Sequence, residues 1–114
     1  MASVTKKHIE AFKKLRGELE QVSLREGGSS NFWTRLYEEM ENLKCIDNDY
    51  LEHSNAFDSI DNAIGHVQGM SFDECCTWLT WALRGERFCD GLFAGCIKQG
   101  YIRSLLDRVI ELGA

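Results

Sequence analysis

The chain has 114 residues, of which 44% are hydrophobic and 27% charged, and its net charge is −5. This length is typical of one domain and is sufficient to bury a core without a metal or disulfide, so we expect a single domain over residues 1–114. The negative charge argues against a nucleic-acid partner, which binds to basic surfaces. No apolar run is long enough to span a membrane.

The N-terminal segment and the cysteine content indicate in which cellular compartment the protein is expected. The segment MASVTKKHIEAFKK lacks the apolar stretch of a signal peptide. The five cysteines, an odd number, are typical of free thiols in a reducing compartment. We therefore expect a cytoplasmic protein.

Apolar residues recur at helical spacing along nearly the whole chain, and there is no proline. The first helix should end before Gly27 and Gly28, Ser30 or Asn31 can cap the second, and Gly69 ends the third. These three helices are marked by Ile9, Phe12, Leu15, Leu19 and Val22; by Phe32, Leu36, Met40 and Leu43; and by Phe57, Ile60, Ile64 and Val67. Between the second and third, KCIDNDYLEH fits a loop, a helical turn or a short hairpin near residues 44–51.

The segment MSFDECC, residues 70–76, carries the clearest signal for a helix start. Ser71 and Glu74 have the spacing of a capping box, and Met70 and Cys75 occupy the two positions of a hydrophobic staple. The helix that follows is apolar on most sides, which is typical of a helix central in its domain or covered by a partner. Gly85 should end it.

Two more helices complete the prediction. One should run from Glu86 to Gln99, with Gly100 as its left-handed cap. The other carries the apolar stripe Ile102, Leu105, Leu106, Val109 and Ile110. The fold class is therefore all-α, a compact bundle of about five to six helices.

Gly91 and Gly95 are four residues apart and would share one face of the expected fifth helix. Each costs about 1 kcal/mol relative to alanine inside a helix, so the pair predicts close approach of another helix. A phosphate-binding loop is the weaker interpretation. The segment matches neither Gly-x-x-x-x-Gly-Lys-Ser/Thr nor Gly-x-Gly-x-x-Gly, and no strand precedes it.

The C-terminal part also resembles a known family. Arg84-Gly-Glu86-Arg87-Phe88, Gly91, Gly100-x-Ile102 and Leu106-x-Arg108 are similar to the signature of an uncharacterised family of small bacterial and phage proteins, catalogued as a domain of unknown function. The likeness covers roughly residues 72–112 and opens on Phe72-Asp73, while Val109 stands where leucine is expected. The resemblance implies a shared local structure for Arg84, Glu86, Arg87, Phe88 and Gly91, and no catalytic role.

Arg84, Glu86, Arg87 and Asp90 are the candidate binding residues. The two arginines bracket an expected helix start, whose free amides attract anions, so a ligand bearing a phosphate or nucleotide is one interpretation. Another is an internal network in which Arg87 pairs with Asp90 and Arg84 with a carboxylate on a neighbouring helix. Glu86, in the first turn, would repel an anion. A protein interface is the third alternative.

The cysteines and histidines do not form a catalytic or metal site by spacing. Cys75 and Cys76 point about 100° apart on a helix, and Cys89 and Cys96 lie two turns apart, too far for one zinc ion. The histidines are scattered. We expect no metal, no cofactor and buried cysteines as the default.

Trp78 and Trp81 are the candidate interface residues, because tryptophan is enriched at binding hot spots. The preferred prediction is a non-enzymatic protein that binds a protein partner and self-associates as a homodimer. A second hypothesis is a binder of small phosphate- or nucleotide-type anions at Arg84 and Arg87. A third is an accessory protein of a mobile element, inhibiting a host system through residues 27–69, which carry eight acidic and two basic side chains.

Two structural features distinguish the first two hypotheses. A concave pocket beside arginines without carboxylate partners favours a small ligand. Arginines paired with Asp90 or Glu86 favour a protein interaction.

Overall fold

The computed structural model describes residues 4–22, 28–54, 57 and 59–113, and its regular elements in these ranges are helices. In chain order they are α1 (Lys6–Glu20), α2 (Gly28–Asn42), α3 (Tyr50–His53), α4 (Ile60–Ile64), the 3-10 helix η2 (Val67–Gly69), α5 (Phe72–Gly85), α6 (Leu92–Lys98) and α7 (Tyr101–Leu112). No strand occurs among them, so the predicted all-α class is confirmed. None of these helices is long and apolar enough to cross a membrane.

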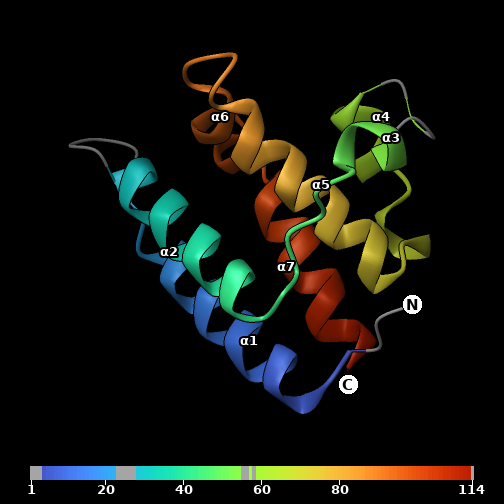
Figure 1. Cartoon of the computed structure of the whole chain (residues 1–114). Coiled ribbons are helices and arrows are strands. Elements are labelled where there is room, and N and C mark those ends of the chain that lie inside the picture. Colours follow the sequence, from blue (N-terminus) through green and yellow to red (C-terminus); the bar gives the residue numbers. More distant parts are fainter. Residues whose placement is uncertain (1–3, 23–27, 55–56, 58, 114) are drawn as a thin grey trace.

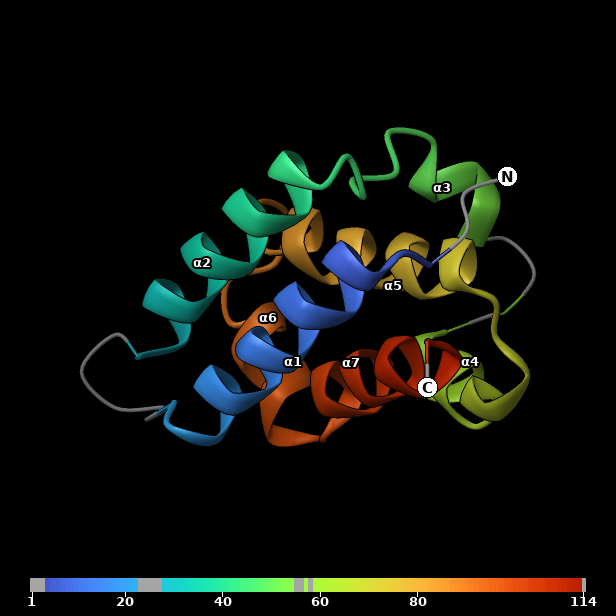
Figure 2. The ribbon, with the colours of Figure 1, turned by 90° about the horizontal axis from the view of Figure 1, so that it is seen from below.

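Helix α5 lies in the centre of the bundle (Figure 1) and contacts α3, α6 and α7. Helix α1 lies between α2 and α7 (Figure 2). Nine of the fourteen residues of α5 are buried: Phe72, Cys75, Cys76, Thr77, Trp78, Leu79, Thr80, Ala82 and Leu83. The apolar excess of this helix is therefore satisfied mainly inside the chain itself.

Two of the long helices, α1 and α5, start at a capping box. Ser71 Oγ accepts a hydrogen bond from the Glu74 amide and the Ser71 amide donates to the Glu74 carboxylate, each over 3.1 Å. This confirms the predicted start of α5. At α1, Thr5 and His8 make the same reciprocal pair, with a histidine ring nitrogen in place of the carboxylate oxygen.

Ion pairs connect α1 to its two neighbours. Arg35 of α2 donates two hydrogen bonds to the carboxylate of Glu18, over 2.9 and 3.0 Å. Arg16 donates to Asp107 of α7 over 2.8 Å. Such partly exposed pairs contribute about 0–1 kcal/mol each, so burial rather than charge holds the three helices together.

The hairpin considered near residues 44–51 is wrong. Lys44 takes a left-handed conformation, with φ of 59°, and the Cys45 amide donates back to the Met40 carbonyl at the end of α2. The Asp47 amide donates to Thr80 Oγ1 of α5 over 3.1 Å. The backbone groups that a hairpin would pair are thus bonded elsewhere, and the chain continues into the helical turn α3.

Several helix boundaries also differ from the prediction. Ser30 and Asn31 lie inside α2 rather than at its cap, and α1 ends at Glu20. Gly27 lies outside the described residues. The expected third helix is divided into α4, which Ser59 caps by accepting from the Asn62 amide over 3.2 Å, and the short η2.

The expected fifth helix begins six residues later than predicted. Gly91 has a φ of +88° and is the N-cap of α6, so residues 86–91 form turns and not a helix. Gly95 would have no atom within 4 Å of an added Cβ, so close packing through Gly91 and Gly95 is wrong. The close approach occurs at Gly85, where a Cβ would lie 3.2 Å from the Leu92 side chain. Gly100, with φ of +82°, is the predicted left-handed residue.

Candidate functional site

A pocket of about 480 Å³ lies beside α2, the end of α5 and the start of α6. We name it the α2–α5 pocket. Its lining residues are Ser30, Trp33, Thr34, Tyr37, Leu83, Arg84, Glu86, Arg87, Gly91, Phe93 and Ala94. It therefore contains three of the four binding residues predicted from the sequence.

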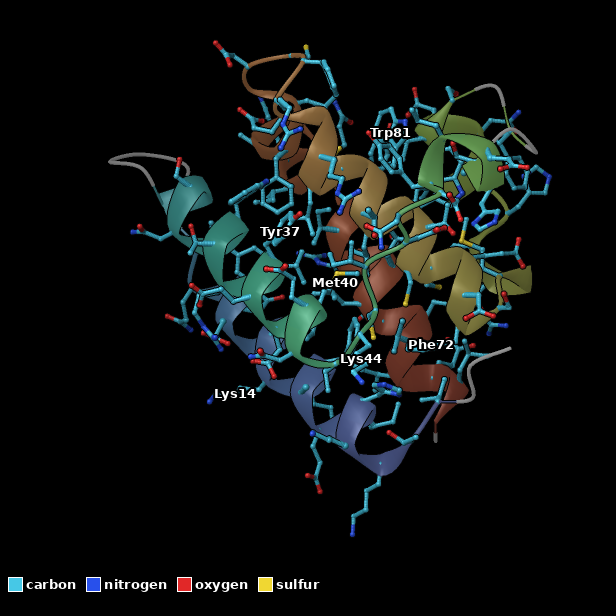
Figure 3. The ribbon with its side chains drawn as sticks, in the orientation of Figure 1. Lys14, Tyr37, Met40, Lys44, Phe72 and Trp81 are labelled. Atoms are coloured by element: carbon cyan, nitrogen blue, oxygen red, sulfur yellow. The ribbon has the colours of Figure 1, made fainter. Side chains whose placement is uncertain are left out.

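One wall of the pocket is aromatic and held in place. The Trp33 indole nitrogen donates to the Leu83 carbonyl over 2.8 Å, which ties α2 to the last turn of α5. The rings of Trp33 and Tyr37 lie 5.0 Å apart at 34°. Figure 3 shows Tyr37 in the region between α2 and α5. The wall is continuous because these residues are four apart on one helix face.

The other side of the pocket carries two guanidinium groups. Arg84 donates to Asn48 Oδ1 over 2.9 Å and lies 5.9 Å from the centre of the Tyr50 ring. Both partners are uncharged, so they orient Arg84 without neutralising it. Within the described ranges neither Arg84 nor Arg87 forms an ion pair, and the predicted pair of Arg87 with Asp90 is not formed. Asp90 is exposed and does not line the pocket.

Glu86 is already engaged with the backbone. Its carboxylate accepts from the Gly91 amide over 2.9 Å and from the Phe93 amide over 2.8 Å. An anion site made from helix-start amides at residues 85–87 is therefore wrong, because α5 ends there and Glu86 occupies the amides where α6 begins. The two arginine side chains remain as the cationic groups that line the pocket.

The two candidate interface residues lie away from this pocket. Trp78 is 4% exposed and belongs to the core. Trp81 is partly exposed, and its ring lies 5.7 Å from that of Trp78. In Figure 3 Trp81 faces α3 and α4, on the other side of α5 from Tyr37. Of the pair, Trp81 alone is available to a partner.

A second pocket, of about 410 Å³, lies where the segment after α2 meets α5. Asp47 is its most constrained residue: one carboxylate oxygen accepts from Thr77 Oγ1 over 2.6 Å and lies 2.7 Å from His53 Nδ1. Its other oxygen accepts from the Asp49 amide over 3.0 Å. Residues 47 and 77 are 30 apart in sequence, which is why spacing alone did not reveal this group.

The electrostatics of this group follow from those contacts. Burial acts to raise the pKa of Asp47, but hydrogen bonds from Thr77 and His53 outweigh it and lower that pKa. The bond to Asp47 raises the pKa of His53. The donor atoms of Asp47, Asp49 and His53 lie within 4.8 Å of one another, a spacing that could accommodate a divalent cation. Both Asp47 oxygens, however, already have protein partners.

The His53–Asp47 pair should make stability depend on pH. Folding raises the pKa of His53, so the ion pair stabilises the fold most at low pH. This contribution to stability is complete below the pKa of His53 in the unfolded chain, about 6.5, and is lost as the pH rises through the pKa in the folded chain. We expect the difference in Tm between the wild type and His53→Gln to be largest near pH 5 and to shrink towards about pH 8. In an Asp47→Asn background the same substitution should have a much smaller pH-dependent effect, because only Asp49 and Glu52 then raise the pKa of His53. An undiminished difference in that background would rule out the His53–Asp47 pair as its cause.

The cysteines lie mostly in the interior. Cys45, Cys75, Cys76 and Cys96 are buried, and Cys89 is exposed on the segment before α6. All five are free thiols. Cys89 is thus the exception to the expected burial.

Comparison with known proteins gives a family and no activity. No curated protein and no solved structure is similar enough to this chain to match it. The model of a family of unknown function, DUF6508, matches residues 10–113, a longer part of the chain than the resemblance seen in the C-terminal motif. The chain, with its all-α fold and its pocket of aromatic and arginine side chains, belongs to this family of unknown function.

Proposed function

We propose that this protein is a non-enzymatic binding protein of the cytoplasm, and that its ligand is an organic anion held in the α2–α5 pocket. The observation that carries the proposal is the placement of Arg84 and Arg87 on a pocket of about 480 Å³, with no carboxylate paired to either among the described residues. These are the two features that favour a small ligand over a protein partner.

The chemistry of the lining narrows the ligand class. Guanidinium groups bind carboxylates and phosphates through two parallel hydrogen bonds, and an aromatic wall accepts a flat apolar group. The volume falls in the range of about 300–1,000 Å³ that is usual for small-molecule sites. Glu86 lines the same pocket, so its charge offsets one of the two arginines. A ligand with a single negative charge, such as an aromatic carboxylate, therefore fits better than a nucleoside triphosphate.

The test is a titration of the protein with aromatic carboxylates. Binding is monitored by tryptophan fluorescence and by native mass spectrometry. The neutral amides of the same compounds serve as control ligands. The variant Trp33→Phe lacks the tryptophan of the pocket, so the fluorescence change that it loses is the one that comes from Trp33. We expect carboxylates to bind and their amides to bind at least about 10-fold more weakly, because a hydrogen bond to a charged group contributes about 1.5–3 kcal/mol. Equal affinity for both would contradict an anion site.

Charge reversal tests the two arginines directly. The double variant Arg84→Glu/Arg87→Glu should lose binding by about 100-fold or more while its helical circular dichroism is unchanged. Lys13→Glu/Lys98→Glu is the control, since it changes the net charge equally at exposed positions on α1 and α6. If the arginine variant loses its helical signal, the arginines are structural and the proposed site is wrong.

A protein partner is the second candidate, and one observation favours it. Phe88, next to Arg87, is 78% exposed, which is unusual for a large aromatic side chain. Native mass spectrometry of the purified protein would show a dimer if this segment and Trp81 mediate self-association. Phe88→Ser should then shift the dimer to monomer, whereas a monomeric wild type would remove self-association from consideration.

A further inference from the structure

Three metal-ligating side chains come together on the segment that leads from α2 into α3. One ligand atom from each of Asp47, Asp49 and His53 lies within 4.8 Å of the other two. Asp49 and His53 are exposed to solvent, whereas the side chain of Asp47 is 15% exposed. Two carboxylates and one imidazole are therefore presented together at the surface, where an ion can reach them.

The backbone of this segment holds the three side chains in place. The Asp47 amide donates to Thr80 Oγ1 of α5 over 3.1 Å. The amides of Tyr50 and His53 donate back to the carbonyls of Asp47 and Asp49, over 3.2 and 3.0 Å. These turns bring residues 47, 49 and 53 to one place. Spacing along the sequence does not indicate this, which is why no metal was expected from the sequence.

The hydrogen bonds of Asp47 leave its carboxylate able to ligate. Thr77 Oγ1 and the Asp49 amide each donate to a different oxygen of Asp47. An ionised carboxylate has about four acceptor positions, so these two bonds do not exhaust it. Metal-ligating carboxylates are usually held by hydrogen bonds of this kind, which fix their orientation. The 2.7 Å contact between Asp47 and His53 Nδ1 holds a proton, whose place a cation can take.

The carboxylate of Asp49 is not engaged by the rest of the described chain. It stands at the N-cap position of α3, where an aspartate usually accepts a hydrogen bond from the helix, yet it makes no capping bond. Within the described ranges it also forms no ion pair with a lysine or arginine. It lies beside Asp47 instead, where the two negative charges repel each other and together attract a cation.

The adjoining pocket adds to this negative charge. The second pocket, of about 410 Å³, is lined by Asp47, by His53 and by the two acidic residues in the first turn of α5, Asp73 and Glu74. Lys44, at the end of α2 in Figure 3, is the one lysine or arginine among the described residues that line it. A concave site lined by three carboxylates and one lysine raises the local concentration of cations.

We propose that Asp47, Asp49 and His53 form a binding site for a divalent metal ion of the zinc type. Imidazole nitrogen is a ligand of zinc and of its neighbours among the transition metals, whereas magnesium and calcium bind through oxygen. Three protein ligands leave a fourth position on the ion for water or an anion. None of the three residues lines the α2–α5 pocket, so the site does not depend on the organic anion proposed above.

The experiment is isothermal titration calorimetry of the full chain, without a histidine tag and cleared of metal with EDTA. We expect one zinc ion to bind per chain and no binding heat with magnesium. Asp49→Asn and His53→Gln should each weaken zinc binding by at least about 10-fold, since even the loss of a group that supports a ligand weakens metal binding by about 10–100-fold. Glu52→Gln and His66→Gln, which change an exposed carboxylate and an exposed imidazole outside the site, should bind zinc as the wild type does.

Cobalt(II) in place of zinc identifies the ligand atoms. The second pocket is also lined by Cys45 and Cys76, and thiolates are strong zinc ligands. Cobalt bound by thiolates absorbs strongly in the near ultraviolet, whereas cobalt bound by oxygen and nitrogen does not. We expect no such band in the wild type, and an unchanged zinc affinity in Cys89→Ser, which lacks the exposed thiol.

Three results would overturn the proposal. One is a wild type that gives no binding heat with zinc. Another is an equal zinc affinity in the wild type, Asp49→Asn and His53→Gln, which would make the zinc an adventitious surface ion. The third is a thiolate band with cobalt. Should either variant lose its helical circular dichroism, NMR of the wild type locates the ion: zinc should shift the ring signals of His53 and leave those of His8 and His66 unchanged.

Discussion

Phe12→Ala is expected to lower the free energy of unfolding by about 3–5 kcal/mol. Phe12 is fully buried on α1, and its ring meets that of Phe72 on α5 edge-on, with centres 6.4 Å apart at 77°. Truncation removes this contact between the first helix and the central helix and leaves a cavity. The measurement is urea denaturation followed by circular dichroism at 222 nm, a wavelength that reports helix content.

The matched control is Lys13→Ala, which makes the same kind of truncation at the next, exposed residue of α1. Surface substitutions of this type change stability by about 0.5 kcal/mol or less. The total free energy of unfolding of a domain of this size is about 5–15 kcal/mol, so the Phe12→Ala variant should be only marginally stable. A loss of stability below about 1 kcal/mol would mean that Phe12 is not buried against Phe72 as described.

Glu86→Ala is expected to lower the free energy of unfolding by about 1–3 kcal/mol, because two backbone amides lose their hydrogen-bond acceptor. The carboxylate of Glu86 bonds to the Gly91 and Phe93 amides, where the chain turns into α6. The Phe93 side chain is 2% exposed, so its amide cannot easily exchange Glu86 for water. Thermal unfolding gives the loss of stability, and amide hydrogen exchange at Gly91 and Phe93 locates it.

Glu86→Gln is the informative partner variant. It retains one acceptor oxygen and removes the charge, so we expect roughly half the loss seen with alanine. Asp90→Ala, on the same turn but exposed, should have little effect. If Glu86→Ala and Asp90→Ala are equally mild, the α5–α6 turn is held by its backbone alone and Glu86 is not its cap.

Local signals predicted some boundaries of the fold correctly and others incorrectly. The reciprocal bonds of Ser71 and Glu74 depend only on residues three apart, so the start of α5 could be predicted from the sequence. The start of α6 could not, because the acceptor for its first amides lies five and seven residues upstream, on Glu86. Helical spacing continued across that turn and concealed the boundary.

The same distinction applies to the candidate site. Arg84, Glu86 and Arg87 could be selected from a short stretch rich in charge and glycine. Trp33 and Tyr37 were not selected, because they lie on α2, about 50 residues earlier, and spacing within α2 marks them only as aromatic residues. The bond from Trp33 to the Leu83 carbonyl is what places them opposite the arginines.

By itself the sequence determined the all-α class, the apolar character of α5 and the left-handed glycine at residue 100, since each follows from periodicity or from backbone sterics over a few residues. The tertiary structure alone decided which side chains meet: Trp33 with Arg84 and Arg87 around one pocket, and Asp47 with Thr77. These pairs are 30 to 54 residues apart in the sequence. Contacts at such separations depend on how helices pack, which local propensity does not encode.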